Sequence, residues 1–353
     1  MNILIAIDSY KGTIDSIEGS KIIASAIKDS GFKGSPILAP MADGGENSIA
    51  IVKSILGGEY IDIEVMGPCL TNIDTHYLLK EDKAYIEVAL VAGYSQMDDL
   101  SILNRTSEGL GMAIIDAINK GAKEINLFLG GSATSDLGLG MLSRLGVKFL
   151  DKENKALFPL PEVFEDIERI DIGNLDKLKG CRFNIICDVT NPLLGPNGTS
   201  YTYAKQKGAS LEEIEILEKG ATHIAEIIYK EFGDDIKNRP YYGCSGGIAM
   251  ASSYFLNADI HLGSEYFSSL YKLGNLLDKH SSLPKSLFPT IARSFASTLF
   301  ARSIILETTF PWKEVLSSLP SPVITKLFSS NRLPSLCKEE KYSLPKKISA
   351  LRK

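Results

Sequence analysis

The chain has 353 residues, of which 44% are hydrophobic, and its formal net charge is −5 with a pI near 5.6. Its length and apolar content predict two packed domains, and its acidic balance argues against a nucleic-acid partner and in favour of a small-molecule ligand. Five scattered cysteines without CxxC spacing indicate reduced thiols, and four dispersed histidines indicate no zinc site. With neither a signal-peptide pattern nor a long apolar run, we expect a cytoplasmic protein, monomeric or homodimeric, that does not bind membranes.

The first 56 residues alternate between apolar strands, polar turns and amphipathic helices. Residues 2–7 predict a strand buried on both faces, and residues 16–30 predict a helix. The same order repeats with a strand over 36–40 and a helix over 47–56. A βαβα opening of this kind predicts a parallel sheet whose functional site lies at the carboxyl ends of its strands.

From residue 60 the pattern changes to alternating segments that predict antiparallel strands, so we expect a second module to begin near Gly67 and Pro68. Further elements are expected in chain order: a helix over 109–120, strands over 124–129 and 183–187, a helix over 211–232, and a helix opened by residues 243–247.

The end of the chain differs in composition from the rest. Residues 275–353 contain no glycine, although the chain has 30, and they hold seven of its 15 prolines. Residues 281–353 carry 12 Lys and Arg against four Asp and Glu. Such a break predicts a segment of different origin, replaced or frame-shifted from about residue 275, with natural divergence as the alternative.

The candidate site turns lie where an apolar strand ends and a helix begins, which is where backbone amides converge on anions. The best phosphate cradle is the turn from Gly130 to Thr134, because its glycines admit a close backbone approach and its hydroxyls can donate to phosphate. The alternative is a tight turn with a Ser/Thr helix cap. A GxxxxGK[ST] motif is missing from the chain, which excludes a P-loop.

Charged residues occupy the other strand ends. Lys11, after the first strand, can neutralise an anionic group, and Asp43 and Glu46 can hold Mg²⁺, although capping and structural roles are open for all of them. Asp188 is a candidate general base, with Asp136 as its rival. Lys207 can meet a phosphate or can belong to a solvated helix start.

Seven motifs taken together resemble, in the same order, the type I bacterial glycerate kinase family, over about residues 1–270. They are Asp8-Ser9-Tyr10-Lys11, Pro40 to Glu46, Gly130 to Thr134, Cys187-Asp188-Val189 with Asn191-Pro192-Leu193, Gly195 to Gly198, Gln206 to Ala209, and Gly246-Gly247. The resemblance implies phosphorylation of D-glycerate by ATP with Mg²⁺, with 2-phosphoglycerate as the favoured product. It also implies an α/β fold: a Rossmann-like parallel-sheet α/β/α domain (residues 1–68 and 250–353) with an inserted α+β domain (residues 69–249).

The turns and the resemblance together predict the site. Catalytic roles are assigned to Asp188, Asp136 and Lys11, and metal binding to Asp43 and Glu46. Substrate or phosphate binding is assigned to a larger set, made up of Asp8, Ser9, Asp43, Gly44, Gly45, Glu46, Gly130, Gly131, Ser132, Thr134, Asn191, Lys207, Gly246 and Gly247.

The chain departs from the family pattern at several turn edges, including Asn47, Ser135, Leu137, Leu139 and the pair Ala204-Lys205. The larger departure is the glycine-free end, which lacks the Gly-Glu-Gly turn of the family. The alternative function is therefore a catalytically impaired relative that binds glycerate or nucleotide. A nicotinamide-dependent oxidoreductase is disfavoured, because no GxGxxG follows the first strand.

Overall fold

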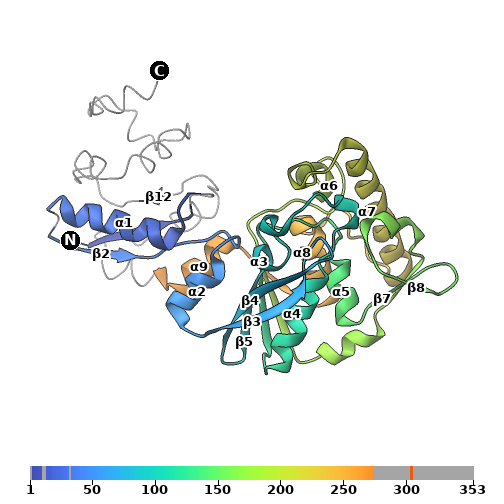
Figure 1. Ribbon diagram of the computed structural model, residues 1–353, viewed down its shortest axis with the longest axis horizontal. Coiled ribbons are helices and arrows are strands. Elements are labelled where there is room, and N and C mark those ends of the chain that lie inside the picture. The colour runs from blue at the N-terminus through green and yellow to red at the C-terminus, as the bar shows by residue number, and fades with distance from the viewer. Residues whose placement is uncertain (1, 10–12, 32, 274–302, 305–353) are drawn as a thin grey trace, which may run out of the picture. The chain divides into compact units, whose positions relative to one another are not determined.

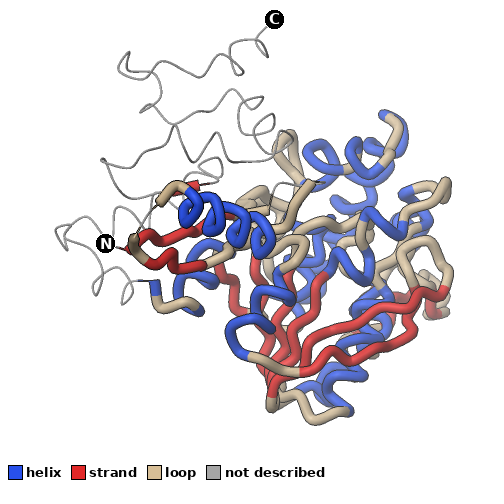
Figure 2. Tube along the Cα trace, turned by 60° about the vertical axis from the view of Figure 1, so that its left-hand side comes forward, coloured by secondary structure: helices blue, strands red, loops and turns tan. Residues whose placement is uncertain are grey.

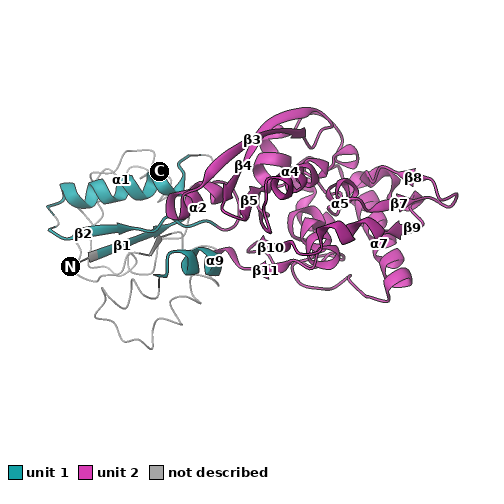
Figure 3. Cartoon of the chain, turned by 90° about the horizontal axis from the view of Figure 1, so that it is seen from below, with its two compact units in different colours: residues 1–42, 264–353 teal, residues 43–263 magenta. Residues whose placement is uncertain are grey.

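The structure is a computed structural model that describes residues 2–9, 13–31, 33–273 and 303–304 (Figure 1). Its contacts divide the chain into unit 1, residues 1–42 and 264–353, and unit 2, residues 43–263 (Figure 3). These limits differ from the expected ones at residues 68 and 249, because the strand that precedes residue 68 pairs into the sheet of unit 2. Most of the glycine-free end lies outside the described residues.

Unit 1 contains the strand–helix–strand opening predicted from the sequence. Strands β1 (Asn2–Ile7) and β2 (Ser35–Leu38) pair in parallel, with Ile3 opposite Pro36, and helix α1 (Ser16–Asp29) connects them. The side chain of Asp15 caps this helix by accepting the N–H of Glu18 at 2.7 Å. Two further elements carry residues of this unit: β12 (Ser303–Ile304), which is antiparallel to β1, and α9 (Gly263–Leu270).

Unit 2 is built on a six-stranded sheet with the order β11-β10-β6-β5-β4-β3. The strands β5, β6, β10 and β11 are parallel, and the β3–β4–β5 pairs are antiparallel, as predicted for this stretch. Both sets belong to one sheet, which confirms an α/β fold with a mostly parallel central sheet. The bounds are β3 Glu59–Met66, β4 Asn72–Lys80, β5 Lys83–Glu87, β6 Glu124–Phe128, β10 Arg182–Ile186 and β11 Asp259–His261.

One face of this sheet carries the main hydrophobic core, because alternate residues of each strand point to the same side. On β5 and β6 these residues are Ala84, Ile86, Ile125 and Leu127, and the register places Phe183 and Ile185 of β10 beside them. Besides the short helix α3 (Val88–Ala92), which directly follows β5, four helices contribute to this core; Figure 2 shows helices (blue) beside the strands (red). The four are α4 (Glu108–Asn119), α5 (Leu139–Leu145), α7 (Leu211–Phe232) and α8 (Ile248–Met250).

The opposite face presents Tyr85 and Glu87 from β5, and helix α2 (Ser48–Leu56) packs against β4 and β5. Buried Ile49, Ile51 and Val52 form its inner side. Because α2 directly follows the turn that contains Asp43 and Glu46, this packing also fixes the end of that turn.

Helix α7 shows why its bounds could be predicted. Ser210 and Glu213 form a capping box at its start, and Gly233, with φ 78°, ends it in the left-handed region. Residues 243–247 were expected to open a helix. In the structure Cys244–Gly247 form a 3₁₀ turn in which Ser245, Gly246 and Gly247 have positive φ, and α8 follows and continues into a π-helix (Ala251–Phe255).

The remaining elements of unit 2 are short. A small sheet has the order β8-β7-β9, made of Ala156–Leu157, Lys148–Leu150 and Arg169–Asp171. The other helices are α3 (Val88–Ala92), α6 (Thr199–Tyr203) and 3₁₀ turns at Tyr94–Gln96, Ile102–Asn104, Pro161–Asp166, Gly173–Leu178 and Lys205–Lys207. Within the ranges given above, every helix is too short or too polar to cross a membrane.

Candidate active site in the larger unit

The parallel strands of unit 2 end at one edge of the sheet, and the candidate residues gather there. Glu87 ends β5, Gly130 follows β6, Asp188 follows β10, and Gly263 follows β11. The turn from Asp43 to Glu46 lies against this edge, because the Gly130 N–H donates to the Gly44 carbonyl at 2.9 Å. The structure therefore brings three of the predicted turns together within unit 2.

Glycine is required where these turns touch. A Cβ on Gly130 would lie 2.4 Å from the Cα of Gly45, and a Cβ on Gly44 would lie 2.6 Å from the carbonyl oxygen of Ile186. Gly44 also has φ +84°, a conformation that other residues rarely adopt. These glycines were expected to admit a ligand, and the structure shows that they also admit another backbone segment.

Asp43 and Glu46 supply the carboxylates of this turn. Asp43 is half-buried and one of its oxygens accepts the Gly45 N–H at 2.9 Å, whereas Glu46 is exposed. Among the residues described in the structure, no group of three potential metal ligands is found. Two carboxylates nevertheless match the donor chemistry of Mg²⁺, which is usually held by one or two carboxylates together with substrate phosphates.

Glu87 is a buried acid that the sequence analysis did not select. Its two carboxylate oxygens accept the N–H groups of Asn47 at 2.9 Å and Ile49 at 3.3 Å, so it caps the start of α2 directly after the Asp43–Glu46 turn. Burial raises the pKa of Glu87 to about 7, against the lowering effect of these backbone donors, and nearby Glu46 adds to the rise. The sequence pattern that could have identified Glu87 is its position directly after the buried run Ala84 to Ile86 of β5.

Lys207 lies beneath the Gly130–Thr134 turn with only 2% of its side chain exposed, so a solvated position is wrong. Its Nζ donates to the Ser132 Oγ at 3.1 Å and to the carbonyl oxygen of Thr134. A Cβ on Gly246 would lie 2.1 Å from that same carbonyl oxygen, which shows how closely the turn at Gly246 and Gly247 approaches. These segments form one cluster, although they are far apart in the chain.

Arg105 joins the same cluster and was also not predicted. Its guanidinium group, 4% exposed, donates to the carbonyl oxygens of Lys207 at 2.7 Å, Leu100 at 2.7 Å and Ala133 at 3.4 Å. Burial lowers the pKa of Lys207 to about 8, and the charge of Arg105 adds to this effect, while Cys244 and Asp136 oppose it. The sequence around Arg105 contains no pattern from which these contacts could have been predicted.

The two candidate bases differ in environment. Asp136 is fully buried, and its carboxylate accepts the N–H and Oγ of Ser107, both at 2.7 Å, and the N–H groups of Gly138 and Gly140, both at 3.2 Å. Burial raises the pKa of Asp136. Asp188 is half-buried at the end of β10, and one of its oxygens accepts the Gly263 N–H at 2.8 Å.

Asn191 is held by contacts within its own loop, whereas Asp8, Ser9 and Lys11 belong to unit 1. The Asn191 amide donates to the Asn197 carbonyl at 2.8 Å and accepts the Tyr203 hydroxyl at 2.6 Å, so it braces its own loop. In unit 1, Asp8 accepts the Ser9 N–H at 2.6 Å directly after β1. Lys11 lies outside the described residues.

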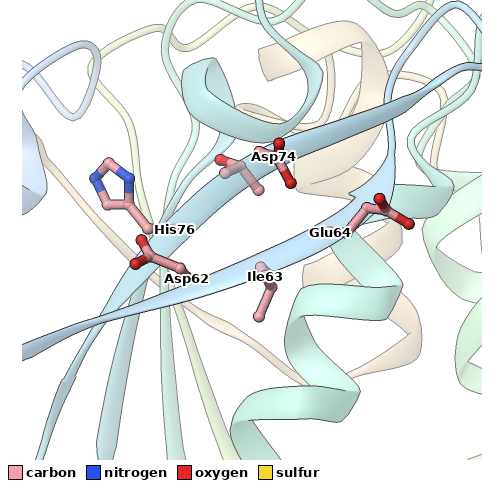
Figure 4. A pocket seen from close by; sticks show the side chains of 6 residues that line it. Asp62, Ile63, Glu64, Asp74 and His76 are labelled. Atoms are coloured by element: carbon pink, nitrogen blue, oxygen red, sulfur yellow. The ribbon is translucent and has the colours of Figure 1, made fainter.

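A hollow of about 500 Å³ lies elsewhere, on the outer hairpin of β3 and β4 (Figure 4). It is lined by Asp62, Ile63, Glu64, Asp74, Thr75 and His76. None of these residues belongs to the predicted site, and the hairpin is at the far side of the sheet from β10 and β11. We therefore place the candidate chemistry at the strand ends and not in this hollow.

The fold and these turns define an α/β protein with glycine-rich turns at the carboxyl ends of its parallel strands. The glycerate kinase family model matches residues 3–283, and the chain belongs to this family. It is 34% identical over 278 residues to glycerate 2-kinase of Escherichia coli, covering 77% of this chain and 73% of that protein. It is 33% identical over 270 residues to glycerate kinase of Bacillus cereus, covering 75% and 71%.

A solved structure agrees with these sequence comparisons. The crystal structure of a Salmonella typhimurium LT2 protein described as glycerate kinase 2 is similar, with a TM-score of 0.72 and 30% identity. The similarity covers 85% of this chain and 84% of that one. The predicted family and the predicted class of enzyme, a kinase of the glycerate type, are thereby confirmed.

Substitution of Gly130 by Ala tests the backbone contact at the strand ends. The added Cβ would overlap the Cα of Gly45, so we expect the free energy of unfolding to fall by about 1–3 kcal/mol. Chemical denaturation measures this change. Gly173→Ala is the matched control, because Gly173 is exposed and a Cβ there meets only the Asp171 side chain; an equal loss in both variants would contradict the contact.

The raised pKa of Glu87 predicts a pH dependence of stability. Between about pH 4.5 and 7 the folded protein keeps the Glu87 proton that the unfolded chain has released, so the free energy of unfolding falls as pH rises, by up to about 1.4 kcal/mol per pH unit. Glu87→Gln should lack this contribution, and its stability relative to the wild type should rise across this range and level off above pH 7. Denaturant titrations at several pH values measure the difference. Exposed Glu153→Gln is the control, and parallel curves for wild type and Glu87→Gln would contradict the assignment.

Proposed function

We propose that this protein transfers the γ-phosphoryl group of ATP to a hydroxyl group of D-glycerate and forms 2-phosphoglycerate. The observation that carries the proposal is the meeting of the Asp43–Glu46, Gly130–Thr134 and Asp188 segments at one edge of the sheet in a member of the glycerate kinase family. A relative with 34% identity is named glycerate 2-kinase, which supports the 2-position.

Each segment has a part in this proposal. Asp188 accepts the proton of the attacking hydroxyl, because it is a half-buried carboxylate that follows β10 at the edge of the sheet where the turns meet. Asp136 acts as a structural anchor, since four donors occupy its two oxygens. The backbone of Gly130 and Gly131 approaches the nucleotide phosphates.

Asp43 and Glu46 would hold Mg²⁺, whose chemistry would be to neutralise charge on the phosphates. The roles predicted for Asp8, Ser9 and Lys11 of unit 1, and for Gly246 and Gly247, form part of the same proposal. A cytoplasmic location and a monomeric or homodimeric state form part of the same proposal, which is supported by the family membership.

A second candidate is a relative that binds glycerate or nucleotide without turnover. The observation in its favour is the composition break after about residue 275, where glycine is missing from the sequence. Incubation of the purified full chain with ATP, Mg²⁺ and D-glycerate separates the two: release of ADP supports the kinase, and ligand-dependent thermal stabilisation without ADP supports the binding protein. Phosphorus NMR of the product reports its position, because a 2-phosphate couples to one carbon-bound proton and a 3-phosphate to two.

Replacement of Asp188 by Asn tests its catalytic role. The amide oxygen can still accept the Gly263 N–H, so folding should be kept, whereas proton acceptance is lost and kcat should fall by about 10²- to 10⁴-fold. Initial rates and thermal unfolding measure both properties. The control is Asp136→Asn, for which we expect mainly lower stability; full activity of Asp188→Asn would contradict the assignment.

A further inference from the structure

Arg105 and Lys207 form an unusual pair, because two cations are buried side by side without an acidic partner in contact. All the hydrogen bonds of Arg105 go to backbone carbonyl oxygens, and those of Lys207 go to the Ser132 hydroxyl and the Thr134 carbonyl. Across residues 2–273 of the structure, masked positions aside, neither side chain makes a salt bridge. Buried charges normally have such a partner, since desolvation of an unpaired charge is costly.

Asp136 is the buried carboxylate whose charge acts on Lys207. Its oxygens are already occupied by Ser107, Gly138 and Gly140. The charge of Arg105 acts on the carboxylates of Asp98 and Glu213 and helps to lower their pKa. Neither of these carboxylates accepts a hydrogen bond from Lys207, so Lys207 is the cation of the cluster for which a carboxylate partner is missing among the described residues.

Three buried hydroxyl groups of the same cluster also lack partners. The Oγ atoms of Ser135 and Ser245 and the Oγ1 atom of Thr134 make no hydrogen bond to any described residue, and these residues are 3%, 9% and 0% exposed. Thr134 supplies the carbonyl that Lys207 binds, and Gly246, which follows Ser245, packs on that carbonyl. Buried hydroxyls without partners are destabilising and are rare in native proteins.

Ser245 adds a sign of functional strain. It has φ 57° and ψ 41°, a left-handed conformation that is unfavourable for a residue other than glycine. Strained residues of this kind cluster at ligand sites, where the surrounding structure holds them in place. Cations without a carboxylate in hydrogen-bond contact, hydroxyls without partners and local strain thus occur together in one cluster.

We propose that the cluster of Arg105, Ser132, Thr134, Ser135, Lys207 and Ser245 binds the carboxylate group of the glycerate substrate. The inference rests on the proposed function and specifies which substrate group is held here. A carboxylate carries one negative charge, which matches the single cation Lys207, and it accepts hydrogen bonds from hydroxyls and from Lys207. The phosphates of ATP carry several negative charges, more than Lys207 alone would neutralise. Arg105 is a positioning residue, because its donors hold the Lys207 and Ala133 backbone.

Substrate kinetics of Lys207→Met test the proposal, with exposed Lys205→Met as the matched control from the same short turn. We expect the KM for D-glycerate to rise about 10- to 100-fold, because a charged hydrogen bond is lost, with the KM for ATP changed less than about threefold. The preference for D-glycerate over glycerol, which lacks the carboxylate, should fall by a similar factor. A rise confined to the KM for ATP would assign the cluster to the nucleotide phosphates and overturn the proposal.

Thr134→Val provides a second test if Lys207→Met does not fold. Valine keeps the shape and removes an unpartnered hydroxyl, so the melting temperature should stay or rise while the KM for D-glycerate rises several-fold. Thr199→Val is the control, because Thr199 is also a buried hydroxyl without a partner but lies at the start of α6. Equal KM values in both variants and the wild type would show that the Thr134 hydroxyl is structural and would overturn the proposal.

Calorimetry separates failure of this inference from failure of the proposed function. If the wild type releases no ADP, the kinase proposal fails, but D-glycerate binding can still be compared with glycerol binding. Tighter binding of D-glycerate that is lost in Thr134→Val would support the carboxylate subsite without turnover. Equal binding of D-glycerate and glycerol would overturn it.

Discussion

The close backbone contact between Gly45 and Gly130 is the constraint on which the candidate site depends. Parallel pairing of β5, β6, β10 and β11 brings four strand ends to one edge, but a side chain on Gly130 would push the Asp43–Glu46 turn away from it. Glu87 then holds the other end of that turn through the first amides of α2. Carboxylates from segments far apart in the chain are thereby fixed near one another by backbone contacts.

Much of this arrangement could be predicted from local sequence patterns, and the exceptions have a common cause. Strands 2–7 and 183–187 were found from apolar runs, and α7 from its capping residues, because these signals act over a few neighbouring positions. Arg105 and Glu87 were missed because their roles arise from partners 102 and 40 residues away. The sequence placed Lys207 near phosphates but could not show that its charge is buried.

The turn at residues 243–247 shows a second limit. It was expected to open a helix, and a helix begins at Ile248, but the sequence did not show that three successive positive φ angles at Ser245, Gly246 and Gly247 interrupt regular structure before it. The interruption allows Gly246 to pack on the Thr134 carbonyl that Lys207 also binds. Local propensity was overridden where the chain builds its cluster of buried charge, as is expected when a functional site conflicts with regular structure.

Asp136 and Asp188 carry the same carboxylate group, but their environments suit different roles. Every oxygen of Asp136 is held by donors, so a proton taken up there would break hydrogen bonds that fix the turn. Asp188 lies at an accessible strand end and remains half-buried, which suits a group that must gain and lose a proton at each turnover. The fully buried acid therefore supplies a fixed charge beside Lys207, and the half-exposed acid is the one suited to proton transfer.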